Sequence, residues 1–287
     1  MTVGEEELER NIRLFGIHEF LSQFFPWLPV FTLFTRGDFG LDGALVLASI
    51  HYLVVVVAEV PSGWLSDRLG RVLTLRITAL LWVVAHGMYW ISDGRFWVVV
   101  LAHTLAAVGF AALSGTNVSF LFDTLESLGR GEEYEHRQAR MTALAHLSLS
   151  ISALVGGAVG LIDVRAVFPL SMAVAIVQLA VTWRMAEPPQ KQAADQYLAQ
   201  LTECLRYLRR PLMAWILGYW MAMIVLEHLA FEVAQPYLTE ALGNAADDLG
   251  STPLVAGFQF AGFFVVGAVA ARAAADLRRV LGFFGVL

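Results

Sequence analysis

The chain has 287 residues, of which 57% are apolar and 15% are charged, and its mean hydropathy is +0.63. Soluble domains usually contain about 25% charged residues, so this composition excludes an ordinary soluble domain and indicates a membrane protein. The net charge of −6 provides no basic surface for nucleic acid, and the single cysteine excludes an intrachain disulfide.

Long apolar segments follow one another along the chain, and a helix needs about 20 such residues to cross a bilayer. These segments predict eight spans, at about 14–35, 43–62, 74–92, 96–124, 141–162, 166–186, 212–238 and 252–271. No small-residue cleavage site follows the first segment, so we expect it to remain as a span and not to act as a cleaved signal peptide. The last residues, LGFFGVL, resemble the beginning of a ninth span.

The basic residues predict the orientation of these spans. If the N-terminus is cytoplasmic, all but three of the 19 Lys and Arg residues lie on the inner side, the exceptions being Arg36, Arg95 and Arg165. Inner loops of membrane proteins carry such an excess of positive charge. We therefore predict a multi-pass integral membrane protein. The preference for arginine over lysine and the many Ala, Val and Gly residues favour a prokaryotic gene, and hence the prokaryotic plasma membrane, the cell inner membrane.

A polar stretch divides the chain after the sixth span. It contains Tyr197, Leu198, Leu201, Leu205 and Leu208 at helical spacing, which predicts a short amphipathic helix on the inner membrane surface. The alternative is an ordinary solvated linker. We therefore divide the chain into a six-helix part over 1–186, a cytoplasmic linker over 187–211 and a further helical part over 212–287.

The segment GWLSDRLGR, residues 63–71, connects the second and third predicted spans on the inner side. Gly63 and Gly70 permit tight turns and close approach of helices. Asp67 and Arg71 are four residues apart and can pair on a helix, and Asp67 can also face the positive end of another helix. An ordinary inner loop explains the arginines but not the glycines and the aspartate at these spacings.

This segment resembles the loop signature of the major facilitator superfamily, Gly-x-Leu-x-Asp-Arg-x-Gly-Arg, and further motifs resemble one branch of it. EVPSG before the loop is similar to Glu-Ile-Pro-Thr-Gly, SGTNVSFLFDTL to the end of the fourth span, and WRMAEPP to the close of the N-terminal half. The resemblance implies an all-α membrane protein, a helical bundle of two six-helix halves with substrate between them. This chain would contain the N-terminal half and the first two to three helices of the C-terminal half, so we expect a C-terminal truncation.

The resemblance also implies that the loop acts as a gate. Asp67 would lock the outward-open state against the positive end of a later helix, and Arg71 would pair with Asp123 near the inner end of the fourth span. The expected gating residues are Gly63, Asp67, Arg68, Gly70, Arg71 and Asp123.

Two residues and one segment depart from the patterns of the superfamily. His103 stands where many proton-coupled members carry arginine, and Asn117 stands where the branch has aspartate. The fifth span contains LVGGAVG without the proline of drug antiporters, which weakens a drug-export interpretation.

Ionisable residues inside spans are costly and are candidates for function. A carboxyl in an apolar setting can carry a proton, and histidine titrates near neutral pH. The candidates for substrate binding or proton coupling are Glu227, Glu232, His103, Gln23, Asn117 and Glu19. Alternatives remain: Glu19 can pair with arginines, and His51 and His86 can serve as contacts between helices.

The predicted function is that of a secondary active transporter, a symporter or antiporter that moves a small organic solute by alternating access with proton coupling. Its partners would be the small-molecule substrate, the lipid bilayer, protons and the missing C-terminal helices, with no nucleic acid. The alternatives are a non-transporting receptor or scaffold of this fold and a non-functional truncated transporter. No zincin pair, nucleophile elbow or phosphate loop is present, so we predict neither enzyme activity nor a cofactor. His228 and Glu232 alone do not predict a metal site.

Overall fold

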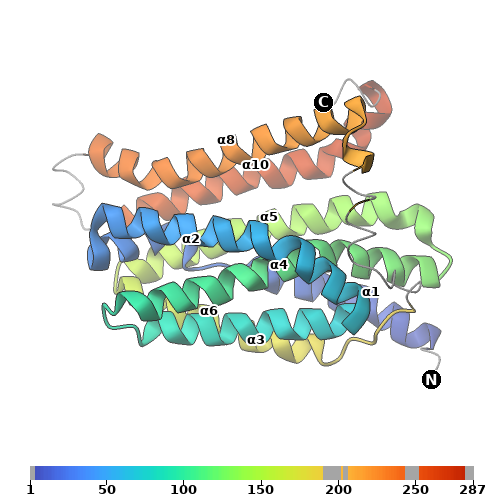
Figure 1. The fold of residues 1–287 in the computed structure, drawn as a ribbon, viewed down its shortest axis with the longest axis horizontal. Coiled ribbons are helices and arrows are strands. Elements are labelled where there is room, and N and C mark those ends of the chain that lie inside the picture. The colour runs from blue at the N-terminus through green and yellow to red at the C-terminus, as the bar shows by residue number, and fades with distance from the viewer. Residues whose placement is uncertain (1–3, 190–201, 203–205, 243–251, 282–287) are drawn as a thin grey trace. The chain divides into compact units, whose positions relative to one another are not determined.

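The computed structural model describes residues 4–189, 202, 206–242 and 252–281, with the side chains of 224, 227–236, 238–242 and 274–281 excepted. Within these ranges the regular structure is entirely helical (Figure 1). The helices are α1 (Glu5–Ser22), α2 (Phe31–Leu69), α3 (Arg71–Trp90), α4 (Phe96–Ser127), α5 (Tyr134–Gly160), α6 (Val167–Thr182), α8 (Pro211–Leu242) and α10 (Thr252–Leu281). Short 3-10 turns, η1 (Leu28–Val30), η2 (Gly131–Glu133) and η3 (Val164–Ala166), join some of them.

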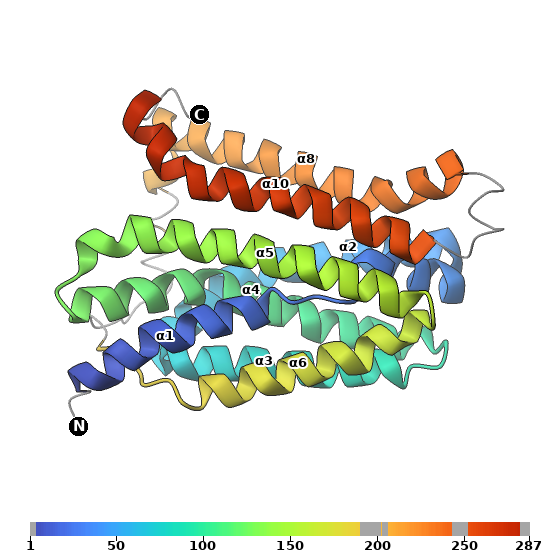
Figure 2. The ribbon, with the colours of Figure 1, turned by 180° about the vertical axis from the view of Figure 1, so that it is seen from behind.

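The chain divides into two compact units, one of residues 1–190 with 253–287 and one of residues 191–252. In the first unit α1 to α6 and α10 run alongside one another (Figures 1 and 2). The described residues contain six helical segments that are long and apolar enough to cross a membrane. The all-α membrane bundle predicted from the sequence is thereby confirmed.

The first predicted span is broken into two helical pieces. α1 ends at Ser22, and regular α-helix resumes only at Phe31. Pro26 and Pro29 lie in the intervening segment, where the proline ring removes a donor and clashes with a preceding turn. The prolines therefore interrupt the α-helix of this span.

The loop expected between the first two spans is also different. Within α2, the second piece of the first span and the second span are two helical pieces that meet directly at a kink at Gly40, where φ is 69° and ψ is −177°. Next to this position, Asp38 forms an ion pair of 2.7 Å with Arg165. A single glycine therefore replaces the connection predicted over about seven residues, because only glycine adopts this backbone conformation readily.

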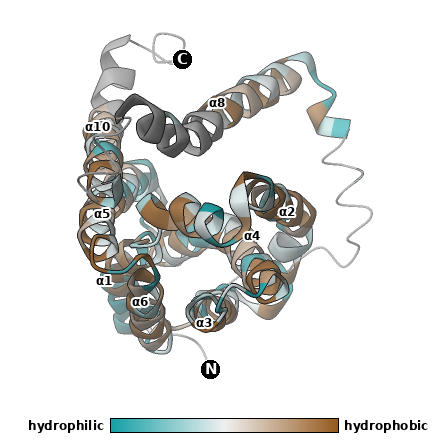
Figure 3. Ribbon diagram, turned by 90° about the vertical axis from the view of Figure 1, so that its left-hand side faces the viewer, coloured by the Kyte–Doolittle hydropathy of each residue, from teal (hydrophilic) through white to brown (hydrophobic). Residues whose placement is uncertain are grey.

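The outward faces of the helices are apolar, as a bilayer requires. Leu53, Val56 and Val57 on α2 are 64% to 70% exposed. Figure 3, which looks along the helices, shows brown apolar residues around α2. Exposed side chains of this kind suit contact with lipid hydrocarbon.

The fifth predicted span uses its glycines for close packing. A Cβ atom added at Gly156 would overlap the carbonyl oxygen of Pro26, and one added at Gly157 would lie 3.1 Å from Cα of Gly257 on α10. The Ser150 hydroxyl donates to the carbonyl of Ala261 on α10 at 3.0 Å. Small residues and hydroxyl groups thus hold α5 and α10 together within the first unit.

The second unit contains α8. On its first turns the rings of Trp215 and Tyr219 stack with centroids 5.7 Å apart. Most of the predicted amphipathic helix lies outside the described residues, and so does the loop after α8. The predicted divisions at 186 and 211 stay predictions.

Candidate functional site

The segment of residues 63–71 is helical almost throughout. α2 continues through Leu69, Gly70 ends it with φ of 103°, and α3 begins at Arg71. The tight turn expected at Gly70 is present. The one expected at Gly63 is not, because Gly63 lies inside α2 and a Cβ added there would meet no atom within 4 Å.

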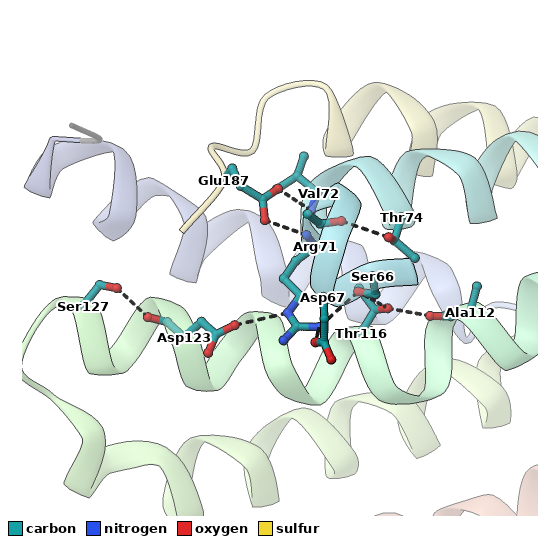
Figure 4. Close-up of polar contacts among 11 residues, drawn as sticks. Ser66, Asp67, Arg71, Val72, Thr74, Ala112, Thr116, Asp123, Ser127 and Glu187 are labelled. Carbon is teal, nitrogen blue, oxygen red and sulfur yellow. Dashed lines mark hydrogen bonds and ion pairs between the residues drawn. The ribbon is translucent and has the colours of Figure 1, made fainter. Parts of the chain in front are cut away.

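Arg71 lies at the centre of a group of polar side chains (Figure 4). Its guanidinium contacts Asp67 at 2.5 Å on α2 and Asp123 at 3.2 Å on α4, and its side chain is only 12% exposed. A further hydrogen bond of 3.2 Å reaches Ser66 Oγ. Both pairings proposed from the sequence are therefore present as contacts, and they join the C-terminal ends of α2 and α4 to the N-terminal end of α3.

Glu187, which lies in the segment after α6, contacts the same group at the start of α3. The backbone N–H groups of Arg71 and Val72 donate to its two carboxylate oxygens at 2.5 Å and 2.8 Å. These N–H groups belong to the first turn of α3, where backbone N–H groups have no hydrogen-bond acceptor inside the helix. A negatively charged carboxylate is also stabilised there by the positive end of the helix dipole. Burial raises the pKa of Glu187, and the two backbone hydrogen bonds oppose that rise.

Gly70 is required by this arrangement for two reasons. Its φ of 103° is a conformation that other residues rarely adopt. A Cβ added at Gly70 would also lie 2.8 Å from Cδ of Glu187. The glycine thus permits both the sharp junction of α2 with α3 and the close approach of the capping carboxylate.

A second polar cluster, the His18–Asn117–Glu19 cluster, joins α1 to α4. His18 Nε2 lies 3.1 Å from Asn117 Oδ1, and Asn117 Nδ2 donates to Glu19 Oε2 at 2.8 Å. All three side chains are buried, with exposed fractions of 0%, 8% and 9% for His18, Asn117 and Glu19. Since the amide oxygen can only accept, His18 donates through Nε2, and its Nδ1 has no hydrogen-bond partner among the described residues.

Of the sequence candidates, Glu19 and Asn117 are thus brought together. The side chain of Glu19 accepts from Asn117, and among the described residues this contact takes the place of the arginine pairing considered as an alternative. Gln23 lies just after α1, in the break of the first span. Glu227 and Glu232 lie on α8, but their side chains fall outside those that the structure describes.

His103 belongs to a different, aromatic group in the half of the bundle away from Arg71. Its Nδ1 lies 2.6 Å from the Tyr89 hydroxyl, its ring stacks on Phe31 at 5.1 Å, and the His51 ring lies 4.8 Å away. The small cavity at this place is lined by Phe25, Trp27, Phe31, His51, Trp82, His86, Tyr89, His103, Ala106 and Phe110. The structure therefore separates His103 from Glu19 and Asn117, and His51 makes the contact between helices that was expected.

Two residues of these sites received no role in the sequence analysis. Glu187 forms part of the WRMAEPP motif. The sequence feature that could have indicated a role for this residue is its position just before two prolines at the end of a span. His18 directly precedes Glu19, but no spacing rule connects this residue to Asn117 on the fourth span.

The family follows from a comparison with protein-family models. The model of the Major Facilitator Superfamily matches residues 17–287. The chain therefore belongs to this superfamily, whose members are membrane transporters, and it is an integral multi-pass membrane protein. A search of curated proteins found no match to the chain. The particular branch and the truncation stay predictions.

Proposed function

We propose that the chain is a proton-coupled secondary transporter of a small organic solute, a symporter or antiporter, with its N-terminus in the cytoplasm. Its proton site is the His18–Asn117–Glu19 cluster, and its inner gate is built around Arg71. The observation that carries this proposal is the Asn117 amide, which is hydrogen-bonded on one side to Glu19 and on the other to His18 within a buried part of the bundle.

The cluster can convert a protonation change into a change of helix contact. An ionised carboxylate buried inside a helical bundle is costly, and proton uptake by Glu19 removes its charge. The hydrogen bond from Asn117 to the carboxylate is charge-assisted, and such bonds are roughly twice as strong as neutral ones. Protonation of Glu19 would therefore weaken the connection of α1 to α4.

The inner gate supports alternating access in a complementary way. Arg71 connects α2 and α4 through Asp67 and Asp123, and Glu187 connects α3 to the residues after α6. These contacts make the inner ends of four spans move as one body. Rigid movement of one helical half against another is how alternating access operates in this kind of fold.

The experiment uses the full chain in liposomes that contain a pH-sensitive dye. A panel of sugars, amino acids, nucleosides and organic acids is added outside, and internal pH and solute uptake are recorded together. We expect one solute class to move with protons in the wild type and Glu19→Gln to lose that movement. Glu132→Gln, which removes an exposed carboxyl of η2, serves as the control and should behave like the wild type.

Two results would count against the proposal. Uptake by the wild type that ignores the pH gradient would contradict proton coupling. Proton-linked uptake that persists in Glu19→Gln would remove the His18–Asn117–Glu19 cluster from that role.

A further inference from the structure

A groove with no role in the proposed transport cycle lies between α5 and α10. It encloses about 440 Å³ and is lined by Arg140, Ala143, Leu144, Leu147, Ala268, Val269 and Arg272. The two helices run side by side in the first unit (Figure 2). They are also joined by the hydrogen bond from Ser150 to Ala261.

The lining has two chemically different parts. Arg140 comes from α5 and Arg272 from α10, both are exposed, and the other five lining residues are apolar. Arg140 directly precedes the fifth predicted span and Arg272 directly follows the eighth. With the N-terminus inside, both guanidinium groups therefore stand at the inner boundary of the bilayer, with the apolar part extending into it.

No carboxylate with a described side chain occupies either arginine of the groove. On α5 the nearby Arg137 is already engaged with Glu133 at 2.7 Å. Among the described side chains, no ion pair with a carboxylate is present at Arg140 or Arg272. Asp276 lies one turn after Arg272, and its side chain is outside the described set.

We propose that this groove binds an anionic phospholipid. The phosphate would lie between Arg140 and Arg272, and one acyl chain would follow Leu144, Leu147 and Val269. Guanidinium groups bind phosphate in a planar, bidentate manner, and basic pockets between spans on the cytoplasmic side suit anionic headgroups. The alternative is that these arginines only orient the protein in the membrane. That role does not require two arginines from different helices to line one groove with an apolar floor.

A lipid bound in this way would bridge two helices that meet at a glycine contact. α5 and α10 approach closely at Gly157 and Gly257, and neither glycine contributes a side chain to the contact. A phosphate held by Arg140 and Arg272 would join the two helices at a second place, far along both helices from that glycine contact.

The test uses the full chain in a mild detergent, with bound lipid counted by native mass spectrometry and stability followed by thermal unfolding. Phosphatidylglycerol, phosphatidylcholine, glycerol phosphate and inorganic phosphate are added separately. We expect retention and stabilisation by phosphatidylglycerol alone. Each of Arg140→Gln and Arg272→Gln should weaken its binding about five-fold, since one basic residue near an anionic surface contributes about 1 kcal/mol.

Controls separate this site from general charge effects. Arg184→Gln removes another exposed arginine from the same side and should leave binding unchanged. Ala268→Trp keeps both arginines but fills the apolar floor, so it should weaken lipid binding even if the arginine variants fold poorly. The proposal is overturned if phosphatidylcholine or inorganic phosphate protects equally. It is also overturned if Arg184→Gln matches the groove variants, or if Ala268→Trp binds phosphatidylglycerol normally.

Discussion

The carboxylate of Glu187 accepts the backbone N–H of Arg71 at 2.5 Å, although the two residues are 116 positions apart in the chain. The same Arg71 extends its side chain to Asp67 and Asp123. One residue thus receives a helix cap through its backbone and forms two ion pairs through its guanidinium. The C-terminal ends of α2 and α4, the N-terminal end of α3 and the segment after α6 meet at this position.

The first prediction concerns the cap itself. Glu187→Ala leaves the N–H groups of Arg71 and Val72 without their acceptors, and loss of a helix cap costs about 1 kcal/mol. We expect a lower midpoint of thermal unfolding in detergent. Glu132→Ala, on exposed η2, is the control and should unfold like the wild type. Equal midpoints for Glu187→Ala and the control would show that Glu187 does not cap α3.

The second prediction compares two glycines of the same motif. Gly70→Ala places a Cβ beside Glu187 in a backbone conformation that suits only glycine, and should destabilise by about 1–3 kcal/mol. Gly63→Ala places a Cβ in open space on a helix and should be neutral or stabilising by up to about 1 kcal/mol. Chemical or thermal unfolding of both variants measures the difference. If the order were reversed, the described junction of α2 with α3 would be wrong.

The third prediction concerns the pair of Arg71 and Asp123, whose Asp123 side chain is 20% exposed. Each of Arg71→Asp and Asp123→Arg leaves part-buried like charges together and should reduce both stability and transport. The double reversal should recover part of the loss. Recovery stays partial because Asp67 would then face a second carboxylate, and adding Asp67→Asn should improve it. Simple additivity of the two single effects would mean that the residues are not coupled.

The fourth prediction follows from the raised pKa of Glu187, which burial causes in opposition to its hydrogen bonds. A group with a raised pKa in the folded state binds its proton more readily there than in the unfolded chain. Its contribution to stability is full below the unfolded value of 4.5 and is lost as pH rises through the folded value. Unfolding midpoints of the wild type should therefore fall over this window. Glu187→Gln should show a smaller fall, and an identical profile in the two proteins would refute the shift.

Much of this arrangement could be predicted from the sequence, because the apolar length of a segment is a local property. The helical bundle and the contacts of Arg71 with Asp67 and Asp123 follow from span lengths, i,i+4 spacing and the family resemblance. The Glu187 cap could not be predicted in this way, since it depends on how the end of the sixth span folds back onto α3. The break expected between the first two spans is present as a kink at Gly40, and the span lengths alone could not show that one glycine is enough to make it.

The partnership of His18 with Asn117 illustrates the same limit. Both residues were visible as polar positions in apolar spans, but their contact depends on the rotation of α1 against α4, which no single-helix pattern specifies. Glu227 and Glu232 were chosen by the same reasoning, and they stay predictions.

The central claim is that Glu19 takes up a proton inside the His18–Asn117–Glu19 cluster. Infrared difference spectroscopy of the full chain during a pH titration tests it without a known substrate, because a protonated carboxyl has its own C=O stretching band. We predict such a band in the wild type, its loss in Glu19→Gln and a shift of its frequency in Asn117→Leu, where the hydrogen bond to Glu19 is removed. A band that survives unchanged in Glu19→Gln would contradict the account and place proton uptake elsewhere in the chain.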